Sequence, residues 1–564
     1  MMEQNSIREV MRWTCLELSF TAKEQINEIR EAEMDVLFTH RESGKTLTVP
    51  AFWDIETWRV RFAPTLEGLW DYRVVCYGRV DLGLNGVSGT IRCVPYTGDY
   101  AIYQHGFLKT EPNVRYFLYD DGTPFFYLGD THWAMLAEEI DEKGPHAADI
   151  ETDSHFKFIV DKRAEQKFTV YQSEPIGHRY EAENGIMAED VLDFRRIDRY
   201  FAYIAEKGLV HANAELCFPS HQMIVRSWDN EDYLYSLTRY WVARYAAYPV
   251  LWTLGQEVDD GVNQRLPRIY EVYRRMARII NRIDPYHHPL TAHQLNAASV
   301  GTLGGIPTSI ADFGYNNYHP EENTRNYTTI RKSKFYGDPA HTWWGAQWRP
   351  MVDQQYLFDI PREYWLRGEG KPTINYEARY DHLYTKNWGA RVEGWISYLS
   401  GMFGYGYGAA DMWCYLSTYS LNDPGFDGVE HITVEDKHIP WGKAILMPTG
   451  GQLTVLYDFF TSFAWWRLVP DFDHGTVYRG QDDDVFYAVA HDGQDAVVLY
   501  LYNRSVKAGG EIVNLDKAAA YKAQWLNPRT GEYTDVFTGV CPDGTFAVPE
   551  KPEADDMILF IKRV

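Results

Sequence analysis

Two glutamates stand directly after apolar segments in the central part of the chain. Glu257 follows VLWTLGQ, and Glu377 follows PTINY. We expect both to end buried strands, with different strands supplying the two carboxyl groups. Two carboxyl groups facing each other across an opening can cleave a glycosidic bond: one acid protonates the leaving oxygen, while the other carboxylate attacks the anomeric carbon or activates water. The sequence therefore predicts a carboxylate pair at one site.

Other polar and aromatic residues follow the strand-like segments in the same way, and we expect them to line that site. The predicted substrate-binding residues at segment ends are Asp130, Trp133, Gln172, Glu174, Asn213, Gln256, His293, Gln294, Asn317 and Tyr318. Each also has a plainer interpretation: a carboxylate can orient a loop, an indole can fill the core, and a histidine can be structural. Glu174 and Glu215 are rival carboxylates that could equally form salt bridges or bind substrate.

Four tryptophans outside these ends are also candidates for the site. Trp343, Trp344 and Trp348 lie close together in a long segment between the predicted sixth and seventh strands, where they are expected to form a lid or a subsite wall. Trp413 follows the last strand-like segment and is expected to form part of the floor of the site. Aromatic faces of this kind suit a ligand that combines an apolar face with many hydroxyl groups.

The elements that must position these residues are short β-like runs that alternate with long amphipathic helical stretches. The eight runs are 125–130, 168–174, 209–215, 250–257, 289–294, 309–317, 372–377 and 401–408. Eight β units alternating with helices predict an α/β fold, a (β/α)8 TIM barrel. The polar ends of the runs would then meet at the carboxyl-terminal face of the barrel, where such barrels place their active sites.

The two ends of the chain have a different pattern. Short alternating runs separated by turn residues fill residues 8 to about 96 and about 466 to 564. This spacing is typical of antiparallel β-sandwiches. We predict three domains: an N-terminal β-sandwich (1–100), the catalytic barrel (101–465) and a C-terminal β-sandwich (466–564).

The composition of the chain disfavours several classes of binding partner. The net charge of −24 disfavours nucleic acid and anionic membranes, which are bound through basic patches. The six cysteines are scattered, so no metal site or disulfide framework is expected. The sequence shows neither a secretory signal nor an apolar run long enough to span a bilayer, which predicts a cytoplasmic protein. The aromatic content, 19 Trp, 41 Tyr and 27 Phe, exceeds what a core alone suggests. The sequence leaves a homo-oligomer possible.

Several of these segments resemble a known family. ARYAAYPVLWTLGQEVD resembles the fourth-strand region of clan A retaining glycoside hydrolases. YLGDTHWAML, NRIDPYHHPLTAHQ, KPTINYEARYD and GYGYGAADMW are similar to the apiosidase-like branch of these barrels, and both terminal regions resemble its accessory domains. The resemblance implies a carbohydrate substrate, no cofactor, Glu257 as acid/base and Glu377 as nucleophile. Tyr318, at the end of the predicted sixth strand, is a candidate hydrogen-bond donor to Glu377.

Two departures limit what the resemblance carries over. Gln256 stands where clan A usually has asparagine, and Glu257 stands where apiosidase-like relatives commonly have aspartate. The resemblance therefore does not extend to apiose as the substrate. Three alternatives stay open: an inverting or transglycosylating enzyme on the same carboxylates, a non-catalytic carbohydrate-binding protein, and an adhesion or scaffold protein.

Overall fold

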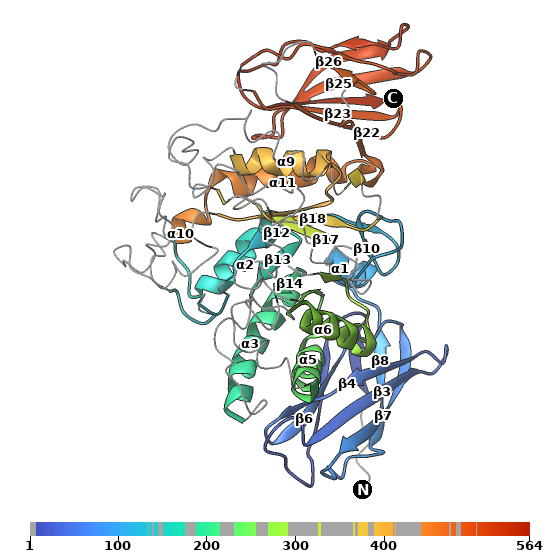
Figure 1. Ribbon diagram of the computed structural model, residues 1–564, viewed down its shortest axis with the longest axis vertical. Helices are drawn as coiled ribbons and strands as arrows, with labels where there is room; N and C mark the ends of the chain where they lie inside the picture. Colours follow the sequence, from blue (N-terminus) through green and yellow to red (C-terminus); the bar gives the residue numbers. More distant parts are fainter. Residues whose placement is uncertain are drawn as a thin grey trace.

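The structure is a computed structural model with side chains. It describes residues 7–133, 135–137, 140–144, 150–174, 188–214, 231–254, 269–291, 325–328, 362, 365–366, 370–378, 380–381, 389–409, 412, 441–472, 475–480, 487–503 and 505–564. In Figure 1 the N-terminal sheets lie at the bottom, the C-terminal sheets at the top, and the α/β part lies between them. The predicted order of parts along the chain is therefore the order in space.

The centre of the molecule is an eight-stranded parallel sheet that curls as a TIM barrel, as predicted. Its strands are β12 (Tyr127–Thr131), β13 (Val170–Ser173), β14 (Val210–Ala214), β15 (Val250–Thr253), β16 (Leu290–Thr291), β17 (Arg325–Thr328), β18 (Thr373–Glu377) and β19 (Gly404–Tyr407). The order in the sheet is β16-β15-β14-β13-β12-β19-β18-β17. Because β12 pairs with β19, the first and last strands are neighbours, which is the connection a closed barrel requires.

One strand of the barrel sheet was not predicted from the sequence. The sixth strand of this sheet, β17, lies at Arg325–Thr328, where it pairs with β18. The predicted run at 309–317 falls outside the described residues. Arg325–Thr328 reads RNYT, which lacks the apolar run used to locate the other strands.

Five of the described helices connect consecutive barrel strands and cover the outside of the sheet (Figure 1): α2 (His155–Glu165), α3 (Ala188–Glu206), α5 (Glu231–Tyr245), α6 (Ile269–Ile283) and α9 (Gly389–Leu399). The short helix α1 (Ala101–His105) precedes the first barrel strand, and α10 (Trp441–Ala444) and α11 (Pro448–Thr461) follow the last one. Ser154 begins α2, since its hydroxyl accepts a hydrogen bond from the backbone N–H of Lys157. A small sheet of β9 (Leu108–Lys109), β10 (Phe117–Tyr119) and β11 (Pro124–Phe125) precedes the barrel.

The N-terminal part forms two packed sheets. One contains β1 (Arg8–Met11), β8 (Ser88–Val94), β7 (Gly68–Gly78), β3 (Ala32–His40) and β4 (Thr46–Pro50); the other contains β2 (Leu16–Phe20), β6 (Thr57–Phe62) and β5 (Phe52–Asp54). Phe38 and Phe62 stack between the two sheets at 3.9 Å. All pairings are antiparallel as predicted, except that β1 runs parallel to β8.

A buried ionic cluster joins this sandwich to the barrel helices. Arg61 of β6 and Arg244 of α5 both donate to the carboxylate of Asp198 on α3, with shortest N···O distances of 2.6 and 2.5 Å. Arg61 also donates to the backbone carbonyl of Arg244. Burial opposes the charged form of Asp198, but Arg61 and Arg244 outweigh it and hold the pKa of Asp198 below its ordinary value. The sandwich is therefore fixed to the outer wall of the barrel.

The C-terminal part has a six-stranded antiparallel sheet and a smaller three-stranded one. The first contains β20 (Val469–Pro470), β22 (Tyr487–His491), β23 (Ala496–Leu501), β28 (Met557–Arg563), β25 (Ala520–Leu526) and β26 (Tyr533–Val540); the second contains β21 (Tyr478–Arg479), β24 (Glu511–Ile512) and β27 (Phe546–Ala547). Asp556 joins this part to the barrel: its fully buried carboxylate accepts hydrogen bonds from Arg391 of α9 and from Arg529 and Tyr500.

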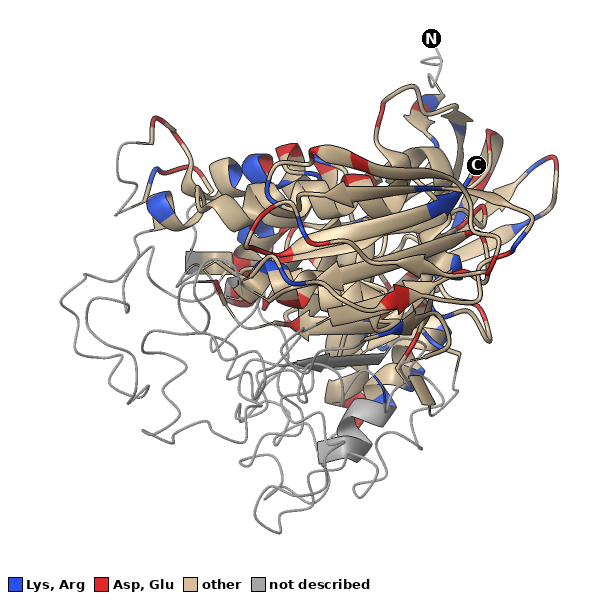
Figure 2. Cartoon of the chain, turned by 90° about the horizontal axis from the view of Figure 1, so that it is seen from above, with Lys and Arg blue, Asp and Glu red and all other residues tan. Residues whose placement is uncertain are grey.

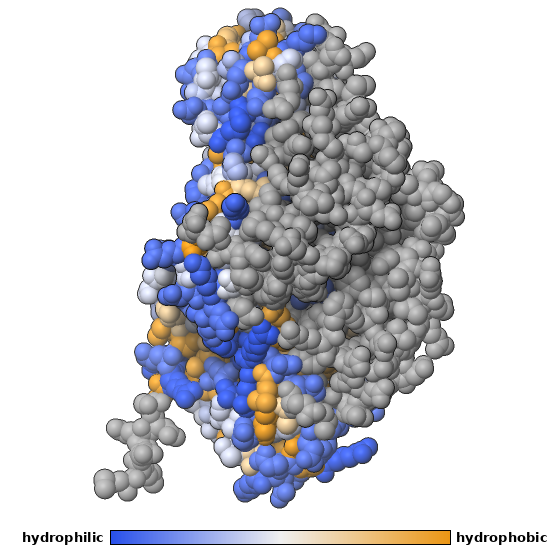
Figure 3. Space-filling model, turned by 90° about the vertical axis from the view of Figure 1, so that its left-hand side faces the viewer, coloured by the Kyte–Doolittle hydropathy of each residue, from blue (hydrophilic) through white to orange (hydrophobic). Residues whose placement is uncertain are grey.

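The surface of the described elements is mostly polar. Figure 2 shows acidic and basic residues interspersed along them, and the described residues on the face in Figure 3 are mainly hydrophilic with small hydrophobic areas. Within the described ranges, no helix combines the length and apolar character needed to cross a bilayer.

The ionic cluster at Asp198 predicts a large loss of stability on mutation. Asp198→Asn removes the carboxylate that two buried guanidinium groups share and leaves Arg61 only Glu17 and Arg244 only Asp54. We therefore expect a loss of about 3 kcal/mol in the free energy of unfolding from urea titrations. The matched control is Asp161→Asn, which breaks an exposed pair with Lys207 and should cost less than about 1 kcal/mol. Equal effects of the two substitutions would contradict the importance of the buried cluster.

The burial of His155 should make the stability of the folded protein depend on pH. Its ring is 1% exposed and stacks on Trp441 at 3.9 Å, and burial lowers the pKa of His155 from 6.5 to about 3. Between these values the unfolded chain binds a proton that the folded chain does not, so stability is present above pH 6.5 and is lost as pH falls, by up to about 1.4 kcal/mol per pH unit. His155→Phe should flatten this fall in thermal unfolding midpoints between pH 7 and 4. His105→Phe, which removes a partly exposed partner of Asp121, serves as control and should retain most of the wild-type fall.

Candidate active site

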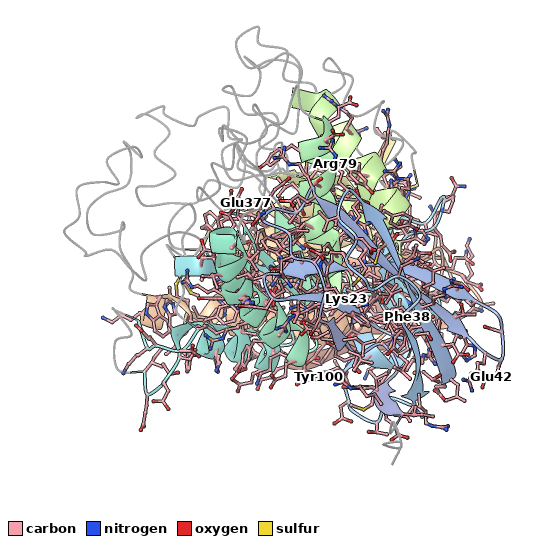
Figure 4. The ribbon with its side chains drawn as sticks, turned by 90° about the horizontal axis from the view of Figure 1, so that it is seen from below. Lys23, Phe38, Glu42, Arg79, Tyr100 and Glu377 are labelled. Atoms are coloured by element: carbon pink, nitrogen blue, oxygen red, sulfur yellow. The ribbon has the colours of Figure 1, made fainter. Side chains whose placement is uncertain are left out.

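Glu377 lies where the prediction places it, at the carboxyl end of β18, the seventh barrel strand. All five residues of β18 are buried, and Glu377 itself is 2% exposed. Figure 4 shows Glu377 apart from the labelled sandwich residues Phe38 and Glu42. A buried carboxylate at this end of a barrel strand is in the region where TIM barrels carry out chemistry.

Two neutral donors hold one oxygen of this carboxylate. The indole Nε1–H of Trp133 donates to Oε1 of Glu377 at 2.8 Å, and the hydroxyl of Tyr380 donates to the same oxygen. The indole N–H is also 2.9 Å from the hydroxyl oxygen of Tyr380. The three side chains are all buried, so these hydrogen bonds form away from bulk water.

The glycines beside β18 make this arrangement possible. A Cβ atom on Gly408 would lie 1.9 Å from Cδ1 of Tyr380, and one on Gly406 would lie 2.2 Å from the carbonyl oxygen of Tyr376. Real Cβ atoms do not approach so closely, so any larger residue would displace the ring or the strand. The GYGYG segment that ends the barrel therefore leaves space for Tyr380 and for the backbone next to Glu377.

Gln172 lies inside the barrel and fixes the backbone just before Glu377. Its Nε2 donates to the carbonyl of Tyr376 at 2.6 Å and to the Thr131 hydroxyl at 3.1 Å. Its Oε1 accepts a hydrogen bond from the Tyr127 hydroxyl at 2.9 Å. Gln172 is fully buried. This predicted substrate-binding residue therefore contributes its amide to hydrogen bonds among β12, β13 and β18.

A hydrogen bond crosses the barrel between the two strands that were predicted to carry the carboxylates. The Thr253 hydroxyl, at the end of β15, and the Tyr376 hydroxyl, on β18, are 2.8 Å apart. These are the fourth and seventh strands, which are not neighbours in the sheet. Glu257 comes four residues after Thr253, outside the described residues. Thr253, the last residue of β15, is thus hydrogen-bonded to Tyr376, the residue before Glu377.

Asp130 has a different environment from Glu377. Its Oδ2 contacts Nε2 of His132 at 2.6 Å and Nε of Arg163 at 2.5 Å, and Asp130 is 1% exposed. Burial favours the neutral form, but Arg163 and His132 outweigh it and hold the pKa of Asp130 below its ordinary value. The Arg163 guanidinium also lies over the ring of Tyr407. This geometry matches the alternative that Asp130 orients the site from a buried ion pair.

The other predicted residues fall into two groups. Asn213 is fully buried and accepts a hydrogen bond from Nε1 of Trp241 at 3.3 Å, while the backbone N–H of Glu174 donates to the carbonyl of Trp133 at 3.0 Å. The structure thus brings Trp133 into contact with Glu377, pairs the backbone of Glu174 with that of Trp133, and bonds Gln172 to the residue before Glu377. Outside the described residues lie the predicted site residues Glu257, Gln256, His293, Gln294, Asn317, Tyr318, Trp343, Trp344, Trp348 and Trp413, as well as Glu215.

Tyr380 and Arg163 were not among the predicted residues. Tyr380 comes three residues after Glu377 in YEARY, so its proximity in sequence was a usable signal. Arg163 lies on α2 and meets Asp130 only through the tertiary fold, which gives no local signal. Among the described residues, no group of three or more His, Cys, Asp or Glu side chains could hold a metal ion.

Comparisons with known proteins agree with this architecture. The family model "Apiosidase-like, catalytic domain" matches residues 111–467, and the model "Domain of unknown function (DUF5060)" matches residues 9–77. No curated protein matches the chain in sequence.

Three solved structures share the fold at low sequence identity. A putative glycoside hydrolase from Bacteroides vulgatus ATCC 8482 is 15% identical, with a TM-score of 0.65 over 99% of this chain and 100% of the other. A structure described as a glycoside hydrolase is 18% identical, with a TM-score of 0.60 over 82% and 98% of the two chains. A glycoside hydrolase family 5 structure from Bacteroides vulgatus ATCC 8482 is 16% identical, with a TM-score of 0.60 over 82% and 95%.

The architecture and these matches define a barrel protein of the glycoside hydrolase fold, with antiparallel sheets at both ends. More specifically, the chain belongs to the apiosidase-like catalytic-domain family, whose model covers most of its length. The resemblance seen in the sequence is confirmed at the level of the family.

We expect substitution of Gln172 to lower the stability of the protein and to change the packing of the aromatic side chains around it. Gln172→Leu keeps roughly the same volume but leaves the Tyr376 carbonyl without its amide donor, so we expect a loss of about 1–3 kcal/mol in urea unfolding. The circular dichroism of the aromatic side chains should change as well, because Tyr127 and Tyr376 lose their shared partner. Gln524→Leu, which removes a surface hydrogen bond to Asp535, is the control and should stay within about 0.5 kcal/mol of wild type. A similar result for both variants would contradict the role given to Gln172.

Proposed function

We propose that this protein is a retaining glycoside hydrolase, in which Glu377 is the nucleophile and Glu257 the acid/base. The observation that carries the proposal is the buried Glu377 carboxylate at the end of the seventh strand, held by Trp133 and Tyr380. Both are neutral donors that favour the ionised form of a carboxylate. A nucleophilic carboxylate must be ionised before it can attack.

The reaction has two steps. In the first, Glu377 attacks the anomeric carbon, the bond to the leaving oxygen breaks, and Glu257 gives its proton to that oxygen. In the second, Glu257 takes a proton from water, the water oxygen bonds to the anomeric carbon, and the ester bond to Glu377 breaks. The products are a free sugar, the released alcohol and the enzyme in its starting protonation state.

The link between β15 and β18 supports the pairing of these two glutamates. Thr253 and Tyr376 are in hydrogen-bond contact across the barrel, and the two glutamates follow them by four residues and by one residue. Carboxyl groups that leave facing strands at the same end of a barrel can approach the roughly 5–5.5 Å separation that a retaining mechanism requires.

We further propose a neutral glycoside or oligosaccharide as the substrate, with cleavage from the chain end. The net charge of −24 disfavours polyanionic sugars. Trp133 places an indole beside Glu377, which suits the apolar face of a sugar ring. The tryptophans predicted to lie around the site, Trp343, Trp344, Trp348 and Trp413, would add further stacking surfaces.

Substitution of the two glutamates tests this proposal. Glu377→Gln should abolish turnover of every aryl glycoside that the wild type cleaves. Glu257→Gln should slow glycosides with poor leaving groups by about 10²–10⁴-fold, and should affect dinitrophenyl glycosides much less in the first step, because these leaving groups need no proton. Added azide should restore turnover of Glu257→Gln and give a glycosyl azide with retained configuration.

The control is Glu511→Gln, in the C-terminal sheets, which should leave turnover unchanged. Proton NMR of the first-formed sugar distinguishes the mechanisms, since a retaining enzyme releases the anomer of the substrate. Inverted product would contradict the double displacement, and unchanged turnover in both Glu257→Gln and Glu377→Gln would contradict the assignment of the site.

A further inference from the structure

We propose that Trp133 and Tyr380 are positioning residues that give the two oxygens of Glu377 different roles. Both residues donate to Oε1 throughout the reaction, and Oε2 forms the bond to the sugar. The inference rests on the proposed function of Glu377 as nucleophile. It adds the identity of the attacking atom and the residues that select it.

The geometry supports this division. Trp133 Nε1 lies 2.8 Å from Oε1 of Glu377, and the Tyr380 hydroxyl donates to the same atom. Two donors on one oxygen occupy the lone pairs that an attack on carbon would need. The two donors also come from different parts of the fold, one following β12 and the other following β18, so they fix the plane of the carboxyl group from two directions.

The direction of the hydrogen bonds follows from the chemistry of the donors. An indole N–H can only donate, so Trp133 must be the donor to Glu377 and to the hydroxyl oxygen of Tyr380. Tyr380 has one proton, which it gives to Oε1. Accepting a hydrogen bond from the indole polarises this hydroxyl and strengthens its own donation. Neither of these two donors carries a formal charge, so Oε1 is oriented by hydrogen bonds from neutral groups.

The effect of the two donors differs between the two reaction steps. In the glycosyl-enzyme, Oε2 belongs to the ester bond and Oε1 is the carbonyl oxygen. When the ester bond breaks, negative charge returns to the carboxylate and spreads onto Oε1. Donors already in place at Oε1 stabilise that charge as it develops. We therefore expect Trp133 and Tyr380 to accelerate release of the sugar from Glu377 more than its attachment.

The experiment uses the full chain and a dinitrophenyl glycoside that the wild type cleaves. In Tyr380→Phe the second step should slow by roughly 10- to 100-fold, the cost of a lost hydrogen bond to a charged group. Stopped-flow traces should then show a burst of dinitrophenol, kcat and KM should fall together, and intact mass spectrometry should find the glycosyl-enzyme. The acidic limb of the pH profile of kcat/KM should move to higher pH, because the ionised carboxylate has lost a donor.

Trp133→Phe should shift the same quantities in the same direction, since it removes the indole N–H but keeps an aromatic ring. The matched control is Tyr398→Phe, which removes a buried hydroxyl that donates to the Tyr127 carbonyl and should give neither burst nor pH shift. Wild-type burst and pH behaviour in both Tyr380→Phe and Trp133→Phe would overturn the inference while leaving the nucleophile in place. Full turnover by Glu377→Gln would instead overturn the proposed function.

A crystal structure of the enzyme trapped with a 2-fluoro glycoside would show directly which oxygen of Glu377 forms the ester bond to the sugar. The inference expects the ester bond on the oxygen that faces away from Trp133 Nε1 and Tyr380, with both donors still bound to the carbonyl oxygen. An ester bond on the oxygen that these two donors contact would overturn it.

Discussion

The side-chain amide of Gln172 is the interaction on which the order of the barrel interior depends. It joins β13 to β12 and β18 by bonding the Tyr127 and Thr131 side chains and the Tyr376 backbone. A polar group this deeply buried is favourable only when both ends of the amide are satisfied, and here they are. Glu377 is the residue directly after Tyr376, so the direction in which its side chain leaves the strand follows from the same hydrogen bonds.

Two of the buried carboxylates of the barrel, Asp130 and Glu377, differ in the groups that surround them. Asp130 is held by Arg163 and His132, whose charges stabilise its anion and leave it a weak base and a weak nucleophile. Glu377 accepts hydrogen bonds at Oε1 from two neutral donors, Trp133 and Tyr380. Both side chains end barrel strands and are almost fully buried. Burial alone therefore does not distinguish them, whereas the groups that donate to each carboxylate do.

Seven strands of the barrel could be predicted because they fall in short β-like runs that alternate with amphipathic helical stretches, a pattern that is visible in the sequence. It did not predict β17, since Arg325–Thr328 is polar and is a strand only through its pairing with β18. Glu377 was predictable as a carboxylate at a strand end. Its donor Tyr380 was missed although it lies only three residues away in the sequence, and the ion pair of Arg163 with Asp130 was not predictable, because it depends on a helix and a strand meeting in space. For the same reason Gln172 was predicted at the site but not as the link among three strands.

The buried carboxylates at the two ends of the barrel have a consequence for how such a chain can be rearranged. Asp556 accepts from Arg391 of the barrel and from Arg529 and Tyr500 of the C-terminal part, while Asp198 accepts from Arg61 of the N-terminal sandwich and from Arg244. Cutting the chain between these parts would leave a buried arginine facing water or an empty partner. Each terminal part is thus held to the barrel by a polar contact that a boundary between them would break, so a transplanted barrel keeps both contacts only when both terminal parts accompany it.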